Sequence, residues 1–312
     1  MRSYLKLFRL PNLLIIILTQ VLARQCIFGT FYASSGLIPQ MPITDFILLV
    51  IATVFIASAG YIINDCLDYN MDEINKPGNS VIGRSISEKQ AYFLYYSLNI
   101  IGVVIGFYLS FRAHKIQLGI IFIIIATMLY YYSLKYKYLP IWGNLTVAFL
   151  SAMVIGIVWL FEFFHLRLDP FAFTLIETVH PIINKLVIGF ACFAFLISFA
   201  REIIKDLQDV EGDRASGCRT LPVVIGINKS RILAVLVILI TMFCLAYFQF
   251  ILIGNNISVA AWYLCLVQAL LISTVVVALF KKPSRKICGI VSTLLKIAMI
   301  TGICSMIFIP MI

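Results

Sequence analysis

Two short stretches of the sequence each carry three aspartates at positions i, i+3 and i+7. The two triplets are Asp65, Asp68 and Asp72, and then Asp206, Asp209 and Asp213. On an α-helix, offsets of three and seven residues fall within an arc of about 60°, so each triplet would point its oxygens to one side. Carboxylates that close repel one another, and we therefore expect a cation between them.

Each triplet favours a magnesium site. Its ligands are carboxylate oxygens, a set that suits Mg²⁺, which commonly bridges carboxylates and substrate phosphates. Two facing triplets could hold about two or three such ions around a diphosphate. The alternative is that these are loop acids with ordinary salt bridges to Lys76, Lys205 or Arg214. The shared spacing of the two triplets favours the metal site.

Transmembrane helices are the elements that must position these acids. Of the 312 residues, 62% are hydrophobic and 12% are charged, against about 45–50% and 25% in soluble domains. Apolar runs long enough to cross a hydrocarbon core of about 30 Å recur along the chain. Nine spans are predicted, at residues 10–30, 43–64, 90–111, 116–134, 143–164, 184–205, 231–253, 258–280 and 289–311.

The fold class predicted from these spans is all-α, a polytopic membrane protein. We expect one transmembrane domain over residues 1–312. The matched acidic stretches, 64–72 and 206–213, each follow the second helix of a group and suggest an internal repeat.

The distribution of positive charge predicts the orientation of the chain. Sixteen lysines and arginines fall in the N-terminal segment and in the loops after the second, fourth, sixth and eighth spans, and four fall in the opposite loops. By the positive-inside rule the first set faces the cytoplasm, so we expect a multi-pass cell-membrane protein with its N-terminus and both acidic stretches on that side. The net charge of +10 is then a topology signal that also attracts anionic membrane lipids, and we expect neither nucleic acid nor a protein partner.

The whole chain resembles the UbiA family of intramembrane prenyltransferases. The resemblance rests on Asn64-Asp65-x-x-Asp68-x-x-x-Asp72 and on Asp206-x-x-Asp209-x-x-x-Asp213. Weaker matches are Arg9-x-Pro11-Asn12, Tyr132-Ser133-Leu134-Lys135, Gly143-Asn144, and Thr220-Leu221-Pro222 with Gly226. The resemblance implies nine transmembrane helices around a central cavity capped by the cytoplasmic 2–3 and 6–7 loops. It also implies Mg²⁺-dependent transfer of a prenyl group from an isoprenyl diphosphate donor to an acceptor.

This resemblance suggests a role for each candidate residue. We expect the six aspartates to bind Mg²⁺ for the diphosphate, and the third of each triplet could instead act as a base or an orienting group. The remaining candidates are Asn64 as an amide ligand, Lys135 and Lys205 as diphosphate contacts, Tyr132 as a ring facing the developing carbocation, and Asn144, Arg201 and Arg24 as substrate-binding residues.

The two arginines are singled out because a charge inside a membrane span is functional by default. Arg24 is a candidate for a phosphate or for an acceptor carboxylate. For Arg201 the alternative is a structural pair with Glu202.

The residues around the second acidic stretch indicate which acceptor the enzyme would use. The run Arg201-Glu202-Ile203-Ile204-Lys205-Asp206 resembles the branch of the family that adds a geranylgeranyl group to geranylgeranylglyceryl phosphate. An aromatic acceptor of the 4-hydroxybenzoate or dihydroxynaphthoate type is the alternative. A membrane transporter is the alternative of another class, but transporters place their acids near the bilayer midplane, whereas these acids lie at the ends of spans.

Overall fold

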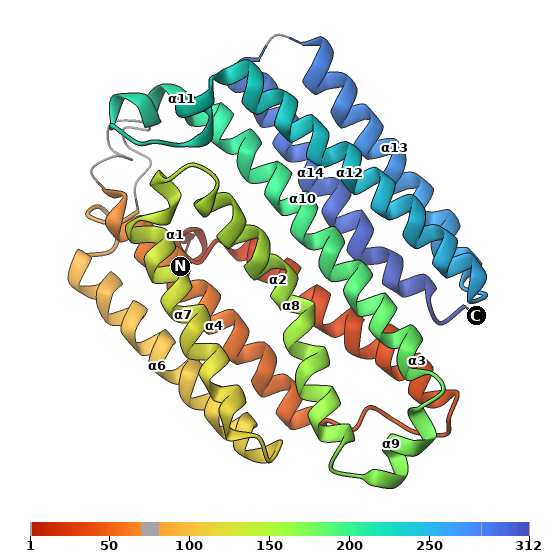
Figure 1. The fold of residues 1–312 in the computed structure, drawn as a ribbon. Coiled ribbons are helices and arrows are strands. Elements are labelled where there is room, and N and C mark those ends of the chain that lie inside the picture. Colours follow the sequence, from red (N-terminus) through yellow and green to blue (C-terminus); the bar gives the residue numbers. More distant parts are fainter. Residues whose placement is uncertain (1, 70–80, 282, 312) are drawn as a thin grey trace. The chain divides into compact units, whose positions relative to one another are not determined.

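The computed structural model describes residues 2–69, 81–281 and 283–311 of the chain. Over these ranges the backbone is almost entirely helical, and its one β-bridge joins Ile82 to Ile86. Nine helical segments in the described ranges are long and apolar enough to cross a membrane (Figure 1). The prediction of an all-α chain with nine spans is therefore confirmed.

The nine segments agree closely with the predicted spans. They are α2–η1–α3 (Leu10–Ala33), α4 (Ile43–Leu67), α6 (Glu88–Arg112), η2–α7 (Ile116–Leu134), α8 (Trp142–Leu166), α10 (His180–Ala215), α12 (Ile227–Gly254), α13 (Ser258–Phe280) and α14–η4 (Arg285–Phe308). Short helices precede or connect them: α1 (Arg2–Leu7), η3 (Tyr136–Tyr138), α9 (Pro170–Ile176) and α11 (Leu221–Ile225). The largest difference is at α10, which continues ten residues past the predicted end at residue 205.

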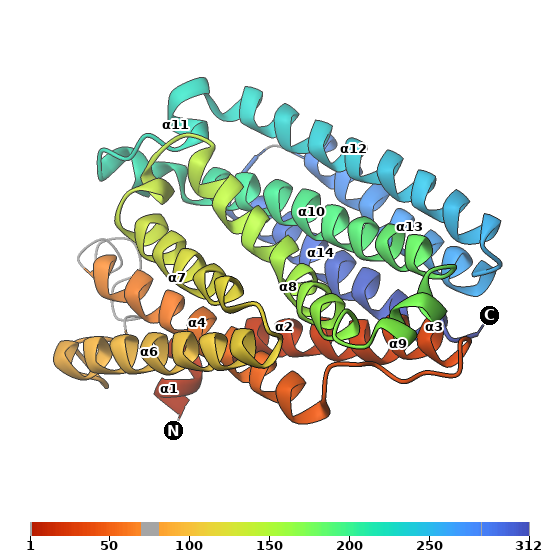
Figure 2. The ribbon, with the colours of Figure 1, turned by 60° about the horizontal axis from the view of Figure 1, so that its bottom comes forward.

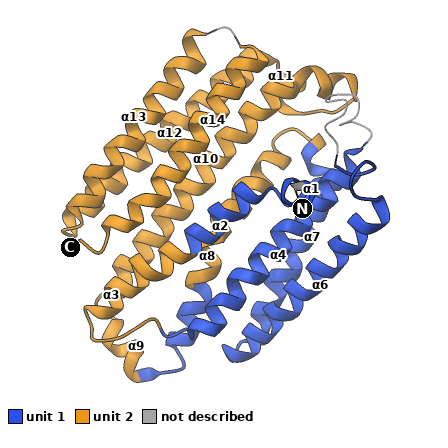
Figure 3. Cartoon of the chain, turned by 180° about the vertical axis from the view of Figure 1, so that it is seen from behind, with its two compact units in different colours: residues 1–20, 40–137, 160–170 blue, residues 21–39, 138–159, 171–312 orange. Residues whose placement is uncertain are grey.

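The chain divides into two compact units, coloured separately in Figure 3. Unit 1 comprises residues 1–20, 40–137 and 160–170, and unit 2 comprises residues 21–39, 138–159 and 171–312. The described part of the first acidic motif belongs to unit 1, and the second motif belongs to unit 2. The single domain expected over 1–312 stays a prediction.

Unit 1 is built on α4, α6 and α7, which lie side by side in both ribbon views (Figures 1 and 2). Small residues let these helices approach: a Cβ at Gly60 would lie 2.9 Å from Leu129, and one at Gly102 would lie 2.7 Å from Ile56. Close packing over glycine is the usual way in which helices associate without a hydrophobic driving force between them.

One end of unit 1 is tied together by an apolar cluster. Its buried members are Leu7, Ile62, Ile63, Cys66, Ile82, Ile86 and Ala91. They come from α1, from the last turns of α4, from the bridged segment at Ile82 and Ile86, and from the first turn of α6, where Ser87 and Gln90 form a capping box. The cluster therefore holds the N-terminal segment beside the end of α4, where the first acidic motif begins.

Unit 2 is built on α10, α12, α13 and α14 (Figures 1 and 2). Helix α10 has 36 residues and is about 54 Å long at 1.5 Å per residue. A hydrocarbon core is only about 30 Å thick. Several turns of α10 must therefore project beyond it, and the last of these turns carry the second acidic motif.

Candidate active site

The two acidic motifs have different backbones. Helix α4 ends at Leu67, and Asp68 is its C-cap residue, with φ −89° and ψ −1°. Asn64 and Asp65 lie in the last turn of that helix, whereas Asp72 lies outside the described residues. All three aspartates of the second motif lie on α10, which continues to Ala215. The helical arc expected from the spacing is thus present for the second motif.

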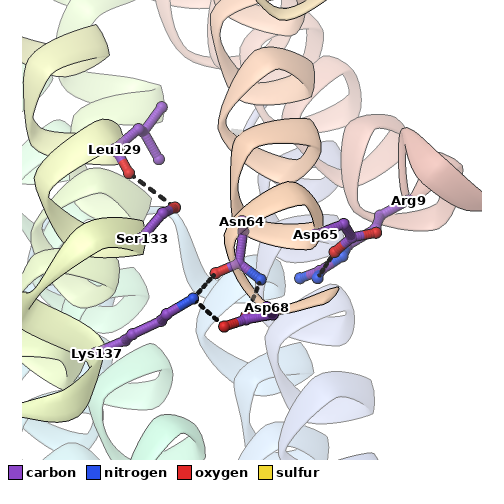
Figure 4. Close-up of polar contacts among 7 residues, drawn as sticks. All are labelled: Arg9, Asn64, Asp65, Asp68, Leu129, Ser133 and Lys137. Atoms are coloured by element: carbon purple, nitrogen blue, oxygen red, sulfur yellow. Dashed lines mark hydrogen bonds and ion pairs between the residues drawn. The ribbon is translucent and has the colours of Figure 1, made fainter. Parts of the chain in front are cut away.

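Basic side chains pair with both described aspartates of the first motif (Figure 4). Arg9 Nη2 donates to Asp65 Oδ1 at 2.7 Å. Lys137 Nζ donates to Asp68 Oδ1, and both side chains are largely buried. Asn64 completes the group, because its Nδ2 donates to Asp68 Oδ2 at 3.0 Å and its Oδ1 accepts from Lys137 Nζ at 3.4 Å.

Arg9 is held in an unusual conformation. Its φ is +51°, in the left-handed region that non-glycine residues rarely adopt. Its guanidinium also lies 5.1 Å from the centre of the Tyr61 ring. Burial alone would lower the pKa of Arg9. The charge of Asp65 and its hydrogen bond, with smaller contributions from Tyr61 and Tyr132, outweigh this effect, so the pKa of Arg9 is raised. The strained backbone is offset by these contacts, which place a permanent positive charge beside the motif.

Lys137 is a residue that sequence reasoning missed. The predicted diphosphate contact, Lys135, is exposed and follows the end of α7 with φ −140°. The 3-10 turn η3 then reorients the chain, and Lys137 within it reaches the first motif. The sequence shows two lysines, Lys135 and Lys137, in the short loop after α7. Their spacing alone does not indicate which of the two reaches the motif. The role of Lys135 stays a prediction.

Neutral side chains contact two aspartates of the second motif. Asn144 Nδ2, in the first turn of α8, donates to Asp206 Oδ2 at 2.8 Å. Thr220 Oγ1, at the N-cap of α11, donates to Asp213 Oδ2 at 2.8 Å. The structure thus places the predicted residue Asn144 at this motif, and it adds Thr220.

The middle aspartate of this motif is partly exposed. The Asp209 side chain is 46% exposed, and its Oδ1 lies 4.0 Å from Nη2 of Arg285, which is itself 59% exposed. An ion pair of that length between exposed groups contributes little stability. Asp209 is therefore free to exchange this partner for a ligand at small cost.

Two of the predicted basic residues lie on α10 just before this motif, with Lys205 one residue and Arg201 five residues before Asp206. Lys205 Nζ donates to Glu202 Oε1 at 2.5 Å, and Arg201 Nη1 lies 3.5 Å from the same oxygen. The structural pair between Arg201 and Glu202, which is the alternative role for Arg201, is thus present at the limit of hydrogen bonding. Arg24 is buried in the π-helical segment η1 (Ala23–Phe28), a backbone form frequent at functional sites.

The donor sets of both motifs fit Mg²⁺. Carboxylates and amides supply oxygen ligands, which this hard cation prefers. Within the described residues no three His, Cys, Asp or Glu side chains converge closely enough to enclose a metal ion. This agrees with the way Mg²⁺ is usually bound, through one or two carboxylates with water and substrate phosphate completing the shell.

The fold and these motifs define a class, that of polytopic helical membrane proteins with paired aspartate motifs at the ends of two spans. The sequence profile of the UbiA prenyltransferase family matches residues 24–300. The chain belongs to the UbiA prenyltransferase family, and it is a prenyltransferase. The predicted family and enzyme class are confirmed, and this membership answers the transporter alternative.

Individual relatives agree with the family match. A digeranylgeranylglyceryl phosphate synthase from Pyrococcus horikoshii is 33% identical over 215 residues, which are 67% of this chain and 65% of that protein, slightly less than two thirds of its length. A solved structure of digeranylgeranylglyceryl phosphate synthase superposes with a TM-score of 0.65 at 24% identity, over 98% of this chain and 96% of the other. A UbiA homolog from Archaeoglobus fulgidus bound to DMAPP and Mg²⁺ has a TM-score of 0.56 at 16% identity, over 97% and 99% of the two chains.

Proposed function

We propose that this enzyme transfers a geranylgeranyl group from geranylgeranyl diphosphate to the free hydroxyl of geranylgeranylglyceryl phosphate, with Mg²⁺ as cofactor. The observation that carries the proposal is that a carboxylate motif and basic residues are close together on α10: Lys205 directly precedes Asp206, and Arg201 lies one turn before Lys205. A donor and an acceptor that each carry phosphate need carboxylates to hold Mg²⁺ and basic side chains to bind the phosphate oxygens. The name of the Pyrococcus relative supports this acceptor, and the ligands of the Archaeoglobus homolog, DMAPP and Mg²⁺, support an isoprenyl diphosphate donor with Mg²⁺.

The proposed reaction is a substitution at the allylic carbon of the donor. The bond from that carbon to the diphosphate oxygen breaks, and diphosphate leaves with the bonding electrons. The hydroxyl oxygen of the acceptor forms the new ether bond and gives up its proton. Bound Mg²⁺ would neutralise the charge that develops on the leaving diphosphate.

The chain's own residues would position and shield these groups. The proposed metal ligands are the carboxylates of Asp65, Asp68, Asp206 and Asp209. Asp72 lies outside the described residues, and Asp213 accepts a hydrogen bond from Thr220. Arg9 and Lys137, which pair with the first motif, would attract the diphosphate oxygens. The surrounding apolar helices would exclude water, which otherwise captures an allylic cation.

We further propose the orientation that the charges predict. The ends of α4 and α10 that carry the motifs would face the cytoplasm of a cell membrane, since the positive charges cluster in the loops at those ends. A water-soluble reagent that labels single cysteines introduced near residue 211 from the inside only would support this orientation.

The test is a transfer assay with purified protein in nanodiscs. Radiolabelled geranylgeranyl diphosphate and Mg²⁺ are supplied with geranylgeranylglyceryl phosphate, 4-hydroxybenzoate or dihydroxynaphthoate. We expect label in the glyceryl phosphate alone, with its loss in Asp68→Asn and Asp209→Asn. Glu211→Gln is the matched control, because Glu211 is an exposed acid two residues after Asp209 and so lies on another face of the same helix. Label moving only into an aromatic acceptor would replace the proposed acceptor.

A further inference from the structure

A groove runs along one face of α14 in unit 2. It has a volume of about 420 Å³ and is lined by Lys286, Gly289, Ile290, Thr293 and Leu294. These residues follow the spacing i, i+3, i+4, i+7 and i+8, so they share one side of the helix. Lys286 and Thr293 are exposed, and the side chain of Ile290 is 42% exposed. The groove therefore opens away from the packed core of unit 2.

The groove is wide at Gly289 because this position has no side chain. A Cβ placed there would have its nearest neighbour, the Nε2 of Gln208 on α10, at 3.5 Å. That distance is an ordinary van der Waals contact, so a side chain at this position would be tolerated. The packing of α10 on α14 therefore does not require the glycine, and the space that it leaves belongs to the groove.

Two polar donors lie at one end of the groove. Lys286 is in the first turn of α14, and the amide of Gln208 lies beside Gly289, one turn further on. Neither side chain has an ion pair or a hydrogen bond within the part of the chain that the structure describes. An ammonium group and an amide without protein partners can both donate to an anion.

The other end of the groove is apolar. Ile290 and Leu294 continue it toward the middle of α14, and the hydroxyl of Thr293 already donates to the carbonyl oxygen of Gly289 at 2.9 Å. From Lys286 to Leu294 the helix rises about 12 Å, and one leaflet of a hydrocarbon core is about 15 Å thick. Because the membrane span of α14 begins at Arg285, the polar end lies at head-group depth and the apolar end lies within one leaflet.

We propose that this groove binds one anionic membrane lipid, with the lipid phosphate at Lys286 and one hydrocarbon chain along Ile290 and Leu294. The groove matches this ligand in charge and in shape, because a cation lies at head-group depth with an apolar surface next to it. A prenyl diphosphate is a poorer match, since none of the described residues that line the groove is a carboxylate that could hold Mg²⁺. The proposal does not depend on which acceptor the enzyme uses.

The experiment measures lipid binding by native mass spectrometry of the full chain released from detergent micelles. Phosphatidylglycerol and phosphatidylcholine with the same acyl chains are titrated, and the dissociation constant of the first bound lipid is obtained for each. We expect the wild type to prefer phosphatidylglycerol, and Lys286→Gln to lose about fivefold of that affinity, the scale of one lysine at an anionic lipid surface. Lys229→Gln is the matched control, because Lys229 is an exposed lysine in the first turn of α12. This control should bind both lipids as the wild type does.

A second variant, Gly289→Leu, tests whether the lipid chain lies in the groove. Leucine favours a helix more than glycine does, so this variant should fold, and its unfolding midpoint without lipid checks this. We expect it to weaken the binding of both lipids. Equal affinities of the wild type for the two lipids, equal losses in Lys286→Gln and Lys229→Gln, or unchanged binding by a folded Gly289→Leu would each overturn the proposal. Displacement of the first lipid by geranylgeranyl diphosphate would assign the groove to the prenyl donor and would overturn it as well.

Discussion

Asp68 ends a helix and pairs with a lysine, whereas Asp209 lies inside a helix and is almost half exposed. Both residues are the middle member of an aspartate triplet with the same spacing. At the first motif Arg9 and Lys137 neutralise the described carboxylates. At the second, Asn144 and Thr220 donate neutral hydrogen bonds to two of the three.

One sequence pattern can therefore occur in two electrostatic states. A metal ion that binds the first motif must displace Arg9 and Lys137, which already pair with the carboxylate oxygens of Asp65 and Asp68. At the second motif an amide and a hydroxyl donate hydrogen bonds that orient two of the three carboxylates. We therefore expect Mg²⁺ to bind first at the second motif, and the first motif to bind it together with the diphosphate, whose oxygens give Arg9 and Lys137 new partners.

The largest expected effect is on activity at the second motif. Asp206→Asn preserves the size of the side chain but removes a carboxylate that Asn144 orients. We expect kcat to fall by roughly 10²–10³-fold, the scale of losing one electrostatic contact to a developing charge. Initial rates at saturating Mg²⁺ measure it, with Glu211→Gln as the control. A loss below tenfold would show that Asp206 is not a metal ligand.

A second effect, on stability, should be confined to the first motif. Lys137→Met leaves the carboxylate of Asp68, which is 15% exposed, without its cation. We expect the free energy of unfolding to fall by about 1–3 kcal/mol, less than for a fully buried pair. The double variant Asp68→Asn with Lys137→Met should recover most of this loss. Thermal unfolding in one detergent measures all three, and equal midpoints for the wild type and Lys137→Met would contradict the account.

The strained backbone of Arg9 gives a smaller effect. Both Arg9→Ala and Arg9→Gly remove the pair with Asp65, but only glycine accepts a φ of +51° without strain. We expect Arg9→Gly to be more stable than Arg9→Ala by about 1 kcal/mol. If Arg9→Ala is the more stable of the two, the left-handed conformation is not retained once the ion pair is lost.

The smallest effect is expected at Arg285. Its 4.0 Å contact with Asp209 joins two exposed side chains, and such pairs are worth between 0 and about 1 kcal/mol. Arg285→Gln should therefore shift the unfolding midpoint by no more than about a degree. A larger shift, above all one that persists at high salt, would mean that the second motif depends on a basic partner as the first does.

The spans could be predicted closely because apolar length alone defines them. The end of α10 could not be predicted in the same way, because residues such as Asp206 and Asp209 are polar and do not extend the apolar run. The i, i+3, i+7 spacing of the aspartates indicates only that they would share one side if the helix continued. The ion pairs of Arg9 and Lys137 could not be predicted, because they join residues 56 and 69 positions apart in sequence. Such contacts depend on how α1, α4 and η3 pack.

The most direct test is Mg²⁺ binding without substrate. Wild-type protein, Asp65→Asn with Asp68→Asn, and Asp206→Asn with Asp209→Asn are titrated with Mg²⁺ while thermal stability is followed. We predict that the first-motif variant keeps most of the Mg²⁺-induced rise in the unfolding midpoint and that the second-motif variant loses it. The reverse pattern, or an equal loss in both, would contradict the claim that the two motifs differ in their readiness for metal.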